Sequence, residues 1–195
     1  MGFEIPIENH ETDVLIIGGG AAGTMAAFEC AKAGVNVILV TKGQATSGTT
    51  MVARGGFAAA IGEGDSPALH LSEVLEHGGE LINPDLAKTW THDIIDVAED
   101  LLNWGAQFIT NDKGELDLKQ LPNHTIPRAI HHYDATGEAL TRVLTKKFQA
   151  DNRICCHPLT SIIDLISEDG HVKGAWGIEC SRGILSCFSA RQVIL

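Results

Sequence analysis

The chain has 195 residues, of which 25 are acidic and 14 basic, for a formal net charge of −11. This length suffices for one sizeable hydrophobic core, and the negative charge disfavours binding to nucleic acids, whose backbones are also negative. Apolar runs stay below the roughly 20 residues that span a bilayer, and the first twelve residues carry no basic cluster of the kind that opens a signal peptide. A cytoplasmic protein is therefore expected. The five cysteines form no Cys-x-x-Cys pair, which favours reduced thiols over a metal site.

Residues 13–40 predict a strand, a glycine-rich turn, a helix and a second strand. The run Asp13–Ile17 is apolar and β-branched, as in strands buried on both faces of a parallel sheet. The next six residues are Gly18, Gly19, Gly20, Ala21, Ala22 and Gly23, and they fit the pattern GxGxxG. Residues 24–33 favour a helix that ends before Gly34, and residues 35–40 favour the second strand. This order predicts an α/β protein of the Rossmann-like class.

In such a unit the glycines bind the phosphates of a dinucleotide. Gly18 allows the tight turn, Gly20 lets a pyrophosphate approach the backbone, and Gly23 lets the helix pack close to the strand. The helix N-terminus offers N–H groups and the positive end of its dipole. An acidic residue that binds ribose is expected after the second strand, but Thr41 and Lys42 stand there. This argues against a simple NAD domain; a hydroxyl or a backbone group would serve the ribose, and Lys42 would reach a phosphate.

The segment 41–56 is rich in Gly, Thr and Ser and has few large apolar side chains. It is either a flexible surface loop or, beside the phosphate-binding turn, a cradle for the cofactor.

The rest of the chain predicts three helices followed by short strands. Ser66-Pro67 and Asn83-Pro84 are start signals for helices that end at Gly78-Gly79 and Gly105, and Thr136 caps a third. The apolar stripes expected to be buried are Leu71, Val74 and Leu75; Leu86, Trp90, Ile94, Val97, Leu101 and Trp104; and Leu140, Val143, Leu144 and Phe148. The tryptophans are interpreted as core residues rather than cofactor-stacking residues. The strands expected after Asp151 are 154–156, 161–166, 172–179, 184–188 and 192–195.

Several of these segments resemble the flavoprotein family of fumarate reductase, succinate dehydrogenase and L-aspartate oxidase. Members carry a Ser/Thr-Lys pair after the second strand and then a small-residue loop that ends in Ala-Gln-Gly-Gly. The pair is Thr41-Lys42 here, and the loop ends in Ala53-Arg54-Gly55-Gly56, with Arg54 in place of the usual Gln. Residues 132–137 are similar to the family's Asp-x-Thr-Gly stretch, and residues 190–195 to a strand that leads into another FAD-contacting turn.

The resemblance implies that residues 1–195 are one FAD-binding domain: a parallel sheet with a helical insertion and a β-rich excursion. It also implies that this domain is incomplete, with its second half and a capping domain outside this chain. A sheet that stops after Leu195 would have an unpaired edge, which would favour self-association.

The resemblance also implies which residues bind FAD. They are Gly18, Gly19, Gly20, Ala21, Ala22, Gly23, Thr41, Lys42, Gly48, Thr49, Thr50, Ala53, Arg54, Gly55, Gly56 and Ser161. Membrane-bound members attach FAD covalently to a His of the loop, and the equivalent position here is Thr49. Because Thr cannot form that bond, noncovalent FAD is expected.

The implied reaction is hydride transfer between the flavin and a dicarboxylate such as fumarate or succinate. The catalytic Arg of the family is expected beyond Leu195, so Arg54, Arg128 and Arg142 are not candidates for it. In L-aspartate oxidase a Glu before two glycines contacts substrate, but Leu121 occupies that position here. Two alternatives remain: an L-aspartate oxidase, and a truncated FAD-binding module without activity. An iron–sulfur electron-transfer partner is implied only for the dicarboxylate enzyme.

Histidines 124, 131 and 132 lie near Arg128 in the sequence. They are interpreted either as solvated or hydrogen-bonded side chains, or as an edge of the substrate or flavin site. Their spacing matches no zinc site, because neither a carboxylate nor a Cys shares it.

Overall fold

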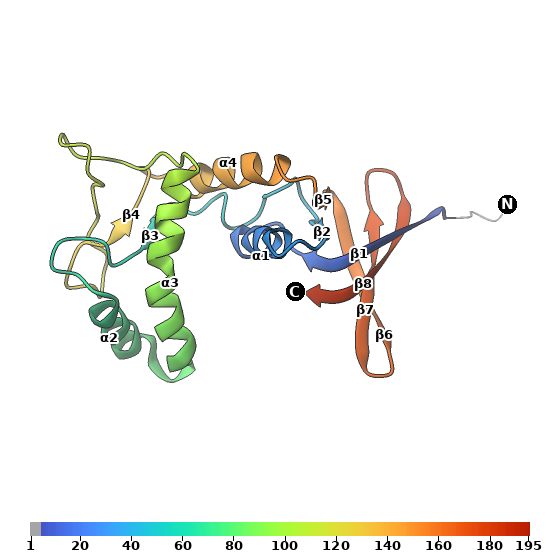
Figure 1. The fold of residues 1–195 in the computed structure, drawn as a ribbon, viewed down its shortest axis with the longest axis horizontal. Helices are drawn as coiled ribbons and strands as arrows, with labels where there is room; N and C mark the ends of the chain where they lie inside the picture. The colour runs from blue at the N-terminus through green and yellow to red at the C-terminus, as the bar shows by residue number, and fades with distance from the viewer. Residues whose placement is uncertain (1–4) are drawn as a thin grey trace. The chain divides into compact units, whose positions relative to one another are not determined.

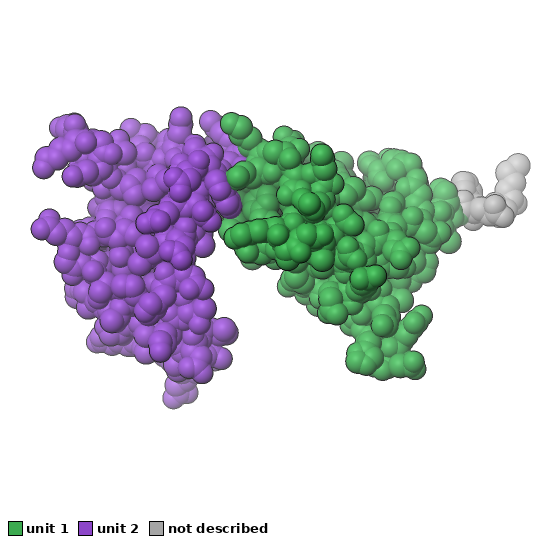
Figure 2. All heavy atoms as spheres, in the orientation of Figure 1, with its two compact units in different colours: residues 1–51, 144–195 green, residues 52–143 purple. Residues whose placement is uncertain are grey.

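The computed structural model describes residues 5–195, and Met1–Glu4, the start of the segment assessed above as a leader, lie outside them. The chain forms two compact units (Figure 2). Unit 1 comprises residues 1–51 and 144–195, and unit 2 comprises residues 52–143. None of the helices in the described part is long and apolar enough to cross a membrane.

Unit 1 is built on a six-stranded sheet with the strand order β5-β2-β1-β8-β7-β6 (Figure 1). The strands are β1 (Ile7–Ile17), β2 (Val37–Val40), β5 (Ile154–His157), β6 (Thr160–Glu168), β7 (His171–Glu179) and β8 (Ile184–Ile194). Strands β5, β2, β1 and β8 pair in parallel, whereas β7 and β6 continue the sheet antiparallel. This confirms the predicted α/β class and the predicted β-rich excursion.

The parallel part of the sheet is buried on both faces, as the apolar runs predicted. Helix α1 (Ala21–Lys32) covers one face, where Ala27 and Ala31 pack against Ile16 and Leu39. On the other face Leu15 and Val40 pack with Ala175 and Phe188 of β7 and β8.

The predictions erred at the ends of two strands. Strand β1 begins at Ile7 rather than Asp13, because its polar first half pairs with β8 alone. The strands expected at 184–188 and 192–195 are one continuous strand, β8, which lies between β1 and β7. Residues 185–189 of β8 pair with both β1 and β7, whereas Ala190, Gln192, Val193 and Ile194 pair with β1 alone. The other side of the end of β8 is therefore without a strand partner among the described residues, as expected.

Unit 2 contains helices α2 (Pro67–Gly78) and α3 (Pro84–Asn103), joined by the short helix η1 (Gly79–Leu81). The start signals are confirmed: the Ser66 hydroxyl accepts the N–H of Leu69, and the Asn83 side chain accepts those of Asp85 and Leu86. Strands β3 (Phe57–Ala58) and β4 (Ala129–Ile130) form a two-stranded antiparallel sheet. The boundary between the units falls within α4 (Thr136–Gln149).

The buried faces of α2 and α3 differ from the predicted apolar stripes. Helix α2 buries His70 and Glu73 instead of Leu75, which is exposed. Helix α3 buries Leu101 as predicted, but its other buried residues are the small side chains Ala87, Thr91 and Ala98. Leu86 is 67% exposed and Trp90 44% exposed, so the prediction of a core role fails for Trp90.

Candidate functional site

The glycine turn between β1 and α1 has the geometry that its sequence predicted. Gly18 has a φ of +121°, a conformation that side-chain-bearing residues rarely adopt. A Cβ on Gly23 would lie 1.9 Å from the carbonyl oxygen of Gly18, so α1 can approach the turn only because residue 23 has no side chain. A Cβ on Gly19 would lie 3.0 Å from the Cβ of the buried Thr41.

The N-terminus of α1 opens at this turn. Gly20 is the N-cap residue and offers no side-chain cap. The Oγ1 of Thr50 accepts a hydrogen bond from the N–H of Ala21 at 3.1 Å, which ties the loop 41–51 to the helix end. The N–H groups of Ala22 and Gly23 have no carbonyl partner within the helix, because they belong to its first turn. Such a terminus is suited to an anion.

A cleft of about 580 Å³ lies over this turn. It is lined by Ile17, Gly18, Gly19, Gly20, Val40, Thr41, Lys42, Gly43, Ser47, Gly48, Thr49, Thr160, Ser161 and Ile162. Lys42 is the one charged residue among them, and in the part of the chain that the structure describes no carboxylate lines the cleft. A concave site with backbone N–H groups, hydroxyls and one cation fits the pyrophosphate and sugar of a dinucleotide.

The cleft brings together eight of the residues predicted to bind the cofactor: Gly18, Gly19, Gly20, Thr41, Lys42, Gly48, Thr49 and Ser161. Two more predicted residues do not line the cleft but shape it. Thr50 accepts the N–H of Ala21 at the start of α1, and Gly23 allows α1 to approach the Gly18 carbonyl. The predictions missed Gly43, Ser47 and Thr160. Thr160 precedes the predicted Ser161, and its N–H donates to the Thr41 carbonyl at 3.1 Å, which holds the start of β6 at the cleft.

Ala21 and Ala22 form the start of α1 and do not line the cleft. The remaining predicted residues, Ala53, Arg54, Gly55 and Gly56, belong to unit 2. Ala53 and Arg54 contact the segment 132–137, the second stretch on which the family resemblance rests. The N–H of Gly137 donates to the Ala53 carbonyl at 2.8 Å, and the Thr136 hydroxyl donates to that of Arg54 at 3.4 Å. Gly56 has a φ of +98°, and a Cβ there would lie 2.5 Å from the Ile130 carbonyl oxygen.

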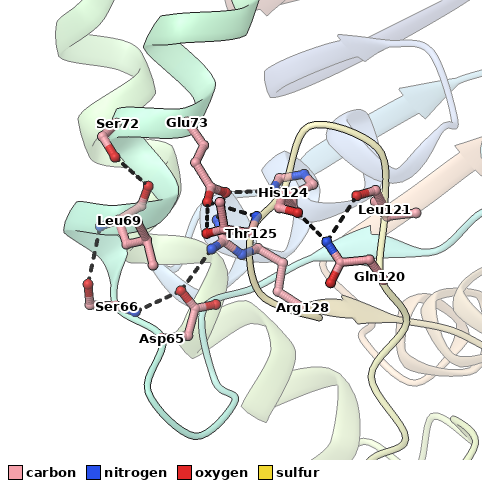
Figure 3. A network of polar contacts seen from close by, with 10 residues as sticks. All are labelled: Asp65, Ser66, Leu69, Ser72, Glu73, Gln120, Leu121, His124, Thr125 and Arg128. Carbon is pink, nitrogen blue, oxygen red and sulfur yellow. Dashed lines mark hydrogen bonds and ion pairs between the residues drawn. The ribbon is translucent and has the colours of Figure 1, made fainter.

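Unit 2 also has a buried polar network that the sequence did not predict (Figure 3). The guanidinium of Arg128 is fully buried between two carboxylates. Its Nη2 donates to Asp65 Oδ1 at 2.9 Å, and its Nη1 lies 2.9 Å from Glu73 Oε2, an ion pair without hydrogen-bond geometry. Glu73 Oε1 accepts the backbone N–H of Thr125 at 2.9 Å and also its hydroxyl. The Nδ1 of His124 lies 3.1 Å from Glu73 Oε2.

Two of the three histidines near Arg128 in the sequence make polar contacts inside unit 2. His124 belongs to the network, and His131 is buried with its Nε2 3.9 Å from Asp117. Burial, followed by the charge of Lys119, lowers the pKa of His131. Because Arg128 is fully buried and paired, it cannot bind a substrate carboxylate, in agreement with its exclusion above.

The network also shifts the pKa values of two side chains. Burial alone would raise the pKa of Glu73, but hydrogen bonds from Thr125 and His124 and the charge of Arg128 outweigh it, and the pKa falls from 4.5 to about 2. Burial, with the charges of Arg128 and His124, lowers the pKa of His70 from 6.5 to about 4, so this histidine is neutral at pH 7. Neither ring nitrogen of His70 has a hydrogen-bond partner among the described residues.

We expect the free energy of unfolding to fall as the pH is lowered from 6.5 toward 4. In this range the unfolded His70 binds a proton that the folded one does not, and the full effect is on the order of 3 kcal/mol. The contribution of Glu73 to the free energy of unfolding is lost at lower pH, as the pH falls from 4.5 to about 2. Urea unfolding at several pH values should show a smaller slope for His70→Phe than for the wild type. Equal slopes would contradict the assignment, and the comparison removes the contributions of other histidines.

A second cleft, of about 570 Å³, lies within unit 2. Its lining is apolar except for glycine and the two carboxylates of Glu63 and Glu115, and no cation lines it among residues 5–195. Two carboxylates repel a pyrophosphate or a dicarboxylate, so this cleft is less suited to phosphate groups than the cleft of unit 1.

The fold and the cleft define a dinucleotide-binding α/β protein with a GxGxxG turn. Comparison with known proteins narrows this class: the family model described as "FAD binding domain" matches residues 13–195. The chain belongs to this family, and its cofactor is FAD.

Three relatives show how the chain compares with known proteins. A fumarate reductase (CoM/CoB) subunit of Methanothermobacter marburgensis is 34% identical over 193 residues, which cover 96% of this chain and 35% of that protein. The L-aspartate oxidase of Streptomyces coelicolor is 37% identical over 139 residues, covering 71% and 24%. The Mycobacterium smegmatis Sdh1 complex in the apo form has a chain with a TM-score of 0.88 and 31% identity, with 95% and 34% covered. The chain thus spans about a third or less of the length of these relatives.

Proposed function

We propose that this chain is the FAD-binding part of a flavoprotein oxidoreductase that interconverts a dicarboxylate pair such as fumarate and succinate. The FAD pyrophosphate binds at Gly18–Gly23 over the N-terminus of α1, with Lys42 as its cation. The ribityl and isoalloxazine groups bind along residues 48–56, and the adenine side lies near Ser161. The observation that supports this binding mode is the glycine-lined, carboxylate-free cleft of unit 1.

The FAD is bound noncovalently in this proposal. Thr49 lines the cleft and is exposed there. The resemblance places it where a histidine carries covalent FAD in the membrane-bound members. None of residues 41–56 is a histidine, so the loop has no imidazole for that bond.

The choice of a dicarboxylate without an amino group is supported by Leu121. The N–H of His124 donates to the Leu121 carbonyl at 3.4 Å, which closes a turn, and Asn123 within it has a φ of +65°. Glycine is the residue favoured at such a φ, and Asn also tolerates it. This supports the alignment of the family's second glycine with Asn123, and hence of the substrate-contacting Glu with Leu121. A leucine offers no ionic contact to an amino group.

The alternative, an L-aspartate oxidase, is supported by the 37% identity to the Streptomyces coelicolor enzyme. A module that binds FAD without turnover is the third candidate, and an iron–sulfur partner subunit belongs only to the first.

The visible absorption spectrum before and after acid precipitation tests the binding mode. We expect a yellow protein whose flavin moves entirely to the acid supernatant, because Thr49 cannot bond to it. Flavin in the pellet would contradict the loop alignment.

Because the catalytic Arg is expected beyond Leu195, turnover is measured on the flavin-loaded full-length protein, and it separates the three functions. Fumarate should reoxidise the dithionite-reduced flavin without oxygen. Hydrogen peroxide released with L-aspartate would select the oxidase, and flavin uptake without either reaction would select the non-catalytic module.

A further inference from the structure

We propose that Glu73 of α2 is a positioning residue that holds the segment 120–128 in its working conformation. The inference rests on the proposed function only in taking this segment, through Leu121, as the one that faces the substrate. The contacts that carry the inference all lie within unit 2.

Every polar contact of the Glu73 carboxylate comes from this segment. One oxygen accepts the N–H and the hydroxyl of Thr125, and the other faces His124 and Arg128. Each oxygen therefore has two partners, although the side chain is only 5% exposed. Figure 3 shows the carboxylate pointing from α2 toward these residues.

Arg128 fastens the end of the segment to a second point near α2. Its Nη2 donates to Asp65 Oδ1, which also accepts the N–H of Ser66 at 2.8 Å. Ser66 is the N-cap residue of α2. The segment is therefore attached next to the first turn of α2 through Asp65, and to the second turn of α2 through Glu73. Residues 120–128 form neither a helix nor a strand, and β4 begins directly after them at Ala129. The backbone of the segment is attached at its end, where the Arg128 carbonyl accepts the N–H of Ala59 at 3.0 Å, and at its base by the Lys119–Ala129 bridge.

The contacts within the segment do not replace this support. The side-chain Nε2 of Gln120 donates to the carbonyls of Leu121 and His124, which closes the turn locally. These bonds shape the turn around Asn123 but do not attach it to another element. Backbone hydrogen bonds between Lys119 and Ala129 hold only the base of the segment. Between these ends, the position of Leu121 depends on residues 124–128 and their partner Glu73.

Glutamine at position 73 keeps the size of the side chain but removes its charge and turns one acceptor into a donor. That donor would face His124, Thr125 or Arg128, all of which are donors in the present geometry. Arg128 would keep Asp65 as a carboxylate partner. The substitution should therefore loosen residues 120–128 more than the rest of unit 2.

The test is amide hydrogen exchange of the FAD-loaded protein, followed by steady-state kinetics with fumarate. Both use the full-length protein, because the catalytic Arg is expected beyond Leu195. The N–H groups of His124 and Thr125 are hydrogen-bonded, to the Leu121 carbonyl and to Glu73. In Glu73→Gln we expect exchange at these two amides to accelerate by about 100-fold or more, the loss associated with breaking a buried ion pair. Exchange in β1 and β2 and the FAD dissociation constant should stay unchanged. The KM for fumarate should rise by about tenfold or more while kcat changes less. Glu76→Gln, an exposed position one turn further along α2, is the matched control and should change none of these.

Thr125→Val removes only the hydroxyl contact to Glu73 and serves if Glu73→Gln unfolds unit 2. It should accelerate exchange at the same residues to a smaller extent. Unchanged exchange at His124 and Thr125 in both variants would overturn the proposal, and so would faster exchange with an unchanged KM. If the wild type does not turn over fumarate, the proposed substrate fails, but faster local exchange would still uphold Glu73 as the residue that holds the segment.

Discussion

Gly23→Ala should weaken FAD binding strongly. The added Cβ would lie 1.9 Å from the Gly18 carbonyl oxygen, a backbone atom that no rotamer change can move. Helix α1 must shift away from β1, and its N-terminal N–H groups leave the phosphate position. Overpacking of this kind costs about 1–3 kcal/mol of stability, and an equal loss of binding free energy weakens FAD affinity by about 10- to 100-fold or more. Flavin fluorescence titration and thermal unfolding measure the two effects.

Gly20→Ala is the control for that prediction. Gly20 has φ −74° and ψ −178°, which any residue adopts, and a Cβ there would meet Thr50 Oγ1 at an ordinary 3.6 Å. Stability should therefore stay within about 1 kcal/mol of the wild type. FAD binding should still weaken, because the methyl group occupies the approach of the pyrophosphate to the backbone. A Gly20→Ala protein that binds FAD like the wild type would reject this placement of the pyrophosphate, and a fully stable Gly23→Ala protein would reject the packing argument.

The parts of the fold set by local rules could be predicted from the sequence. Gly18–Gly23 requires backbone conformations and close approaches that are properties of glycine itself, and the structure shows them. The Ser-Pro and Asn-Pro starts of α2 and α3 follow from hydrogen bonds between the cap side chain and an N–H two or three residues further along the chain. Such features depend on a few adjacent residues, so a pattern suffices to find them.

The errors arose where distant segments decide the structure. The prediction ended one strand at Phe188 and began another at Gln192, but Ser189 and Arg191 lie on the exposed side of one strand whose alternate residues Phe188 and Ala190 are buried. Glu73 was overlooked on a helix because its partners are more than 50 residues away. A charged residue looks solvated until the fold supplies the opposite charge, and no local periodicity carries that information.

Arg128→Met should be the most destabilising single change in unit 2. It preserves much of the side-chain volume but leaves the carboxylates of Asp65 and Glu73 buried without their cation. Loss of one partner of a buried ion pair costs about 3–5 kcal/mol, because the remaining charge has lost its solvation and its counter-ion. Chemical unfolding at pH 7, followed by tryptophan fluorescence, measures the loss, since Trp90 contacts His70 beside the network.

Arg142→Met provides the matched exposed pair. Arg142 bonds Glu138 at the same 2.9 Å, but its side chain is 75% exposed, and such a pair contributes only about 0.3–0.5 kcal/mol. Equal losses for the two variants would show that the Arg128 pairs are not shielded from solvent. The triple change Asp65→Asn, Glu73→Gln and Arg128→Met separates charge from packing further. It should be more stable than Arg128→Met alone, because neutral amides tolerate an apolar neighbour better than two unpaired carboxylates do. No recovery in the triple variant would mean that the loss comes from the shape of the arginine rather than from its charge.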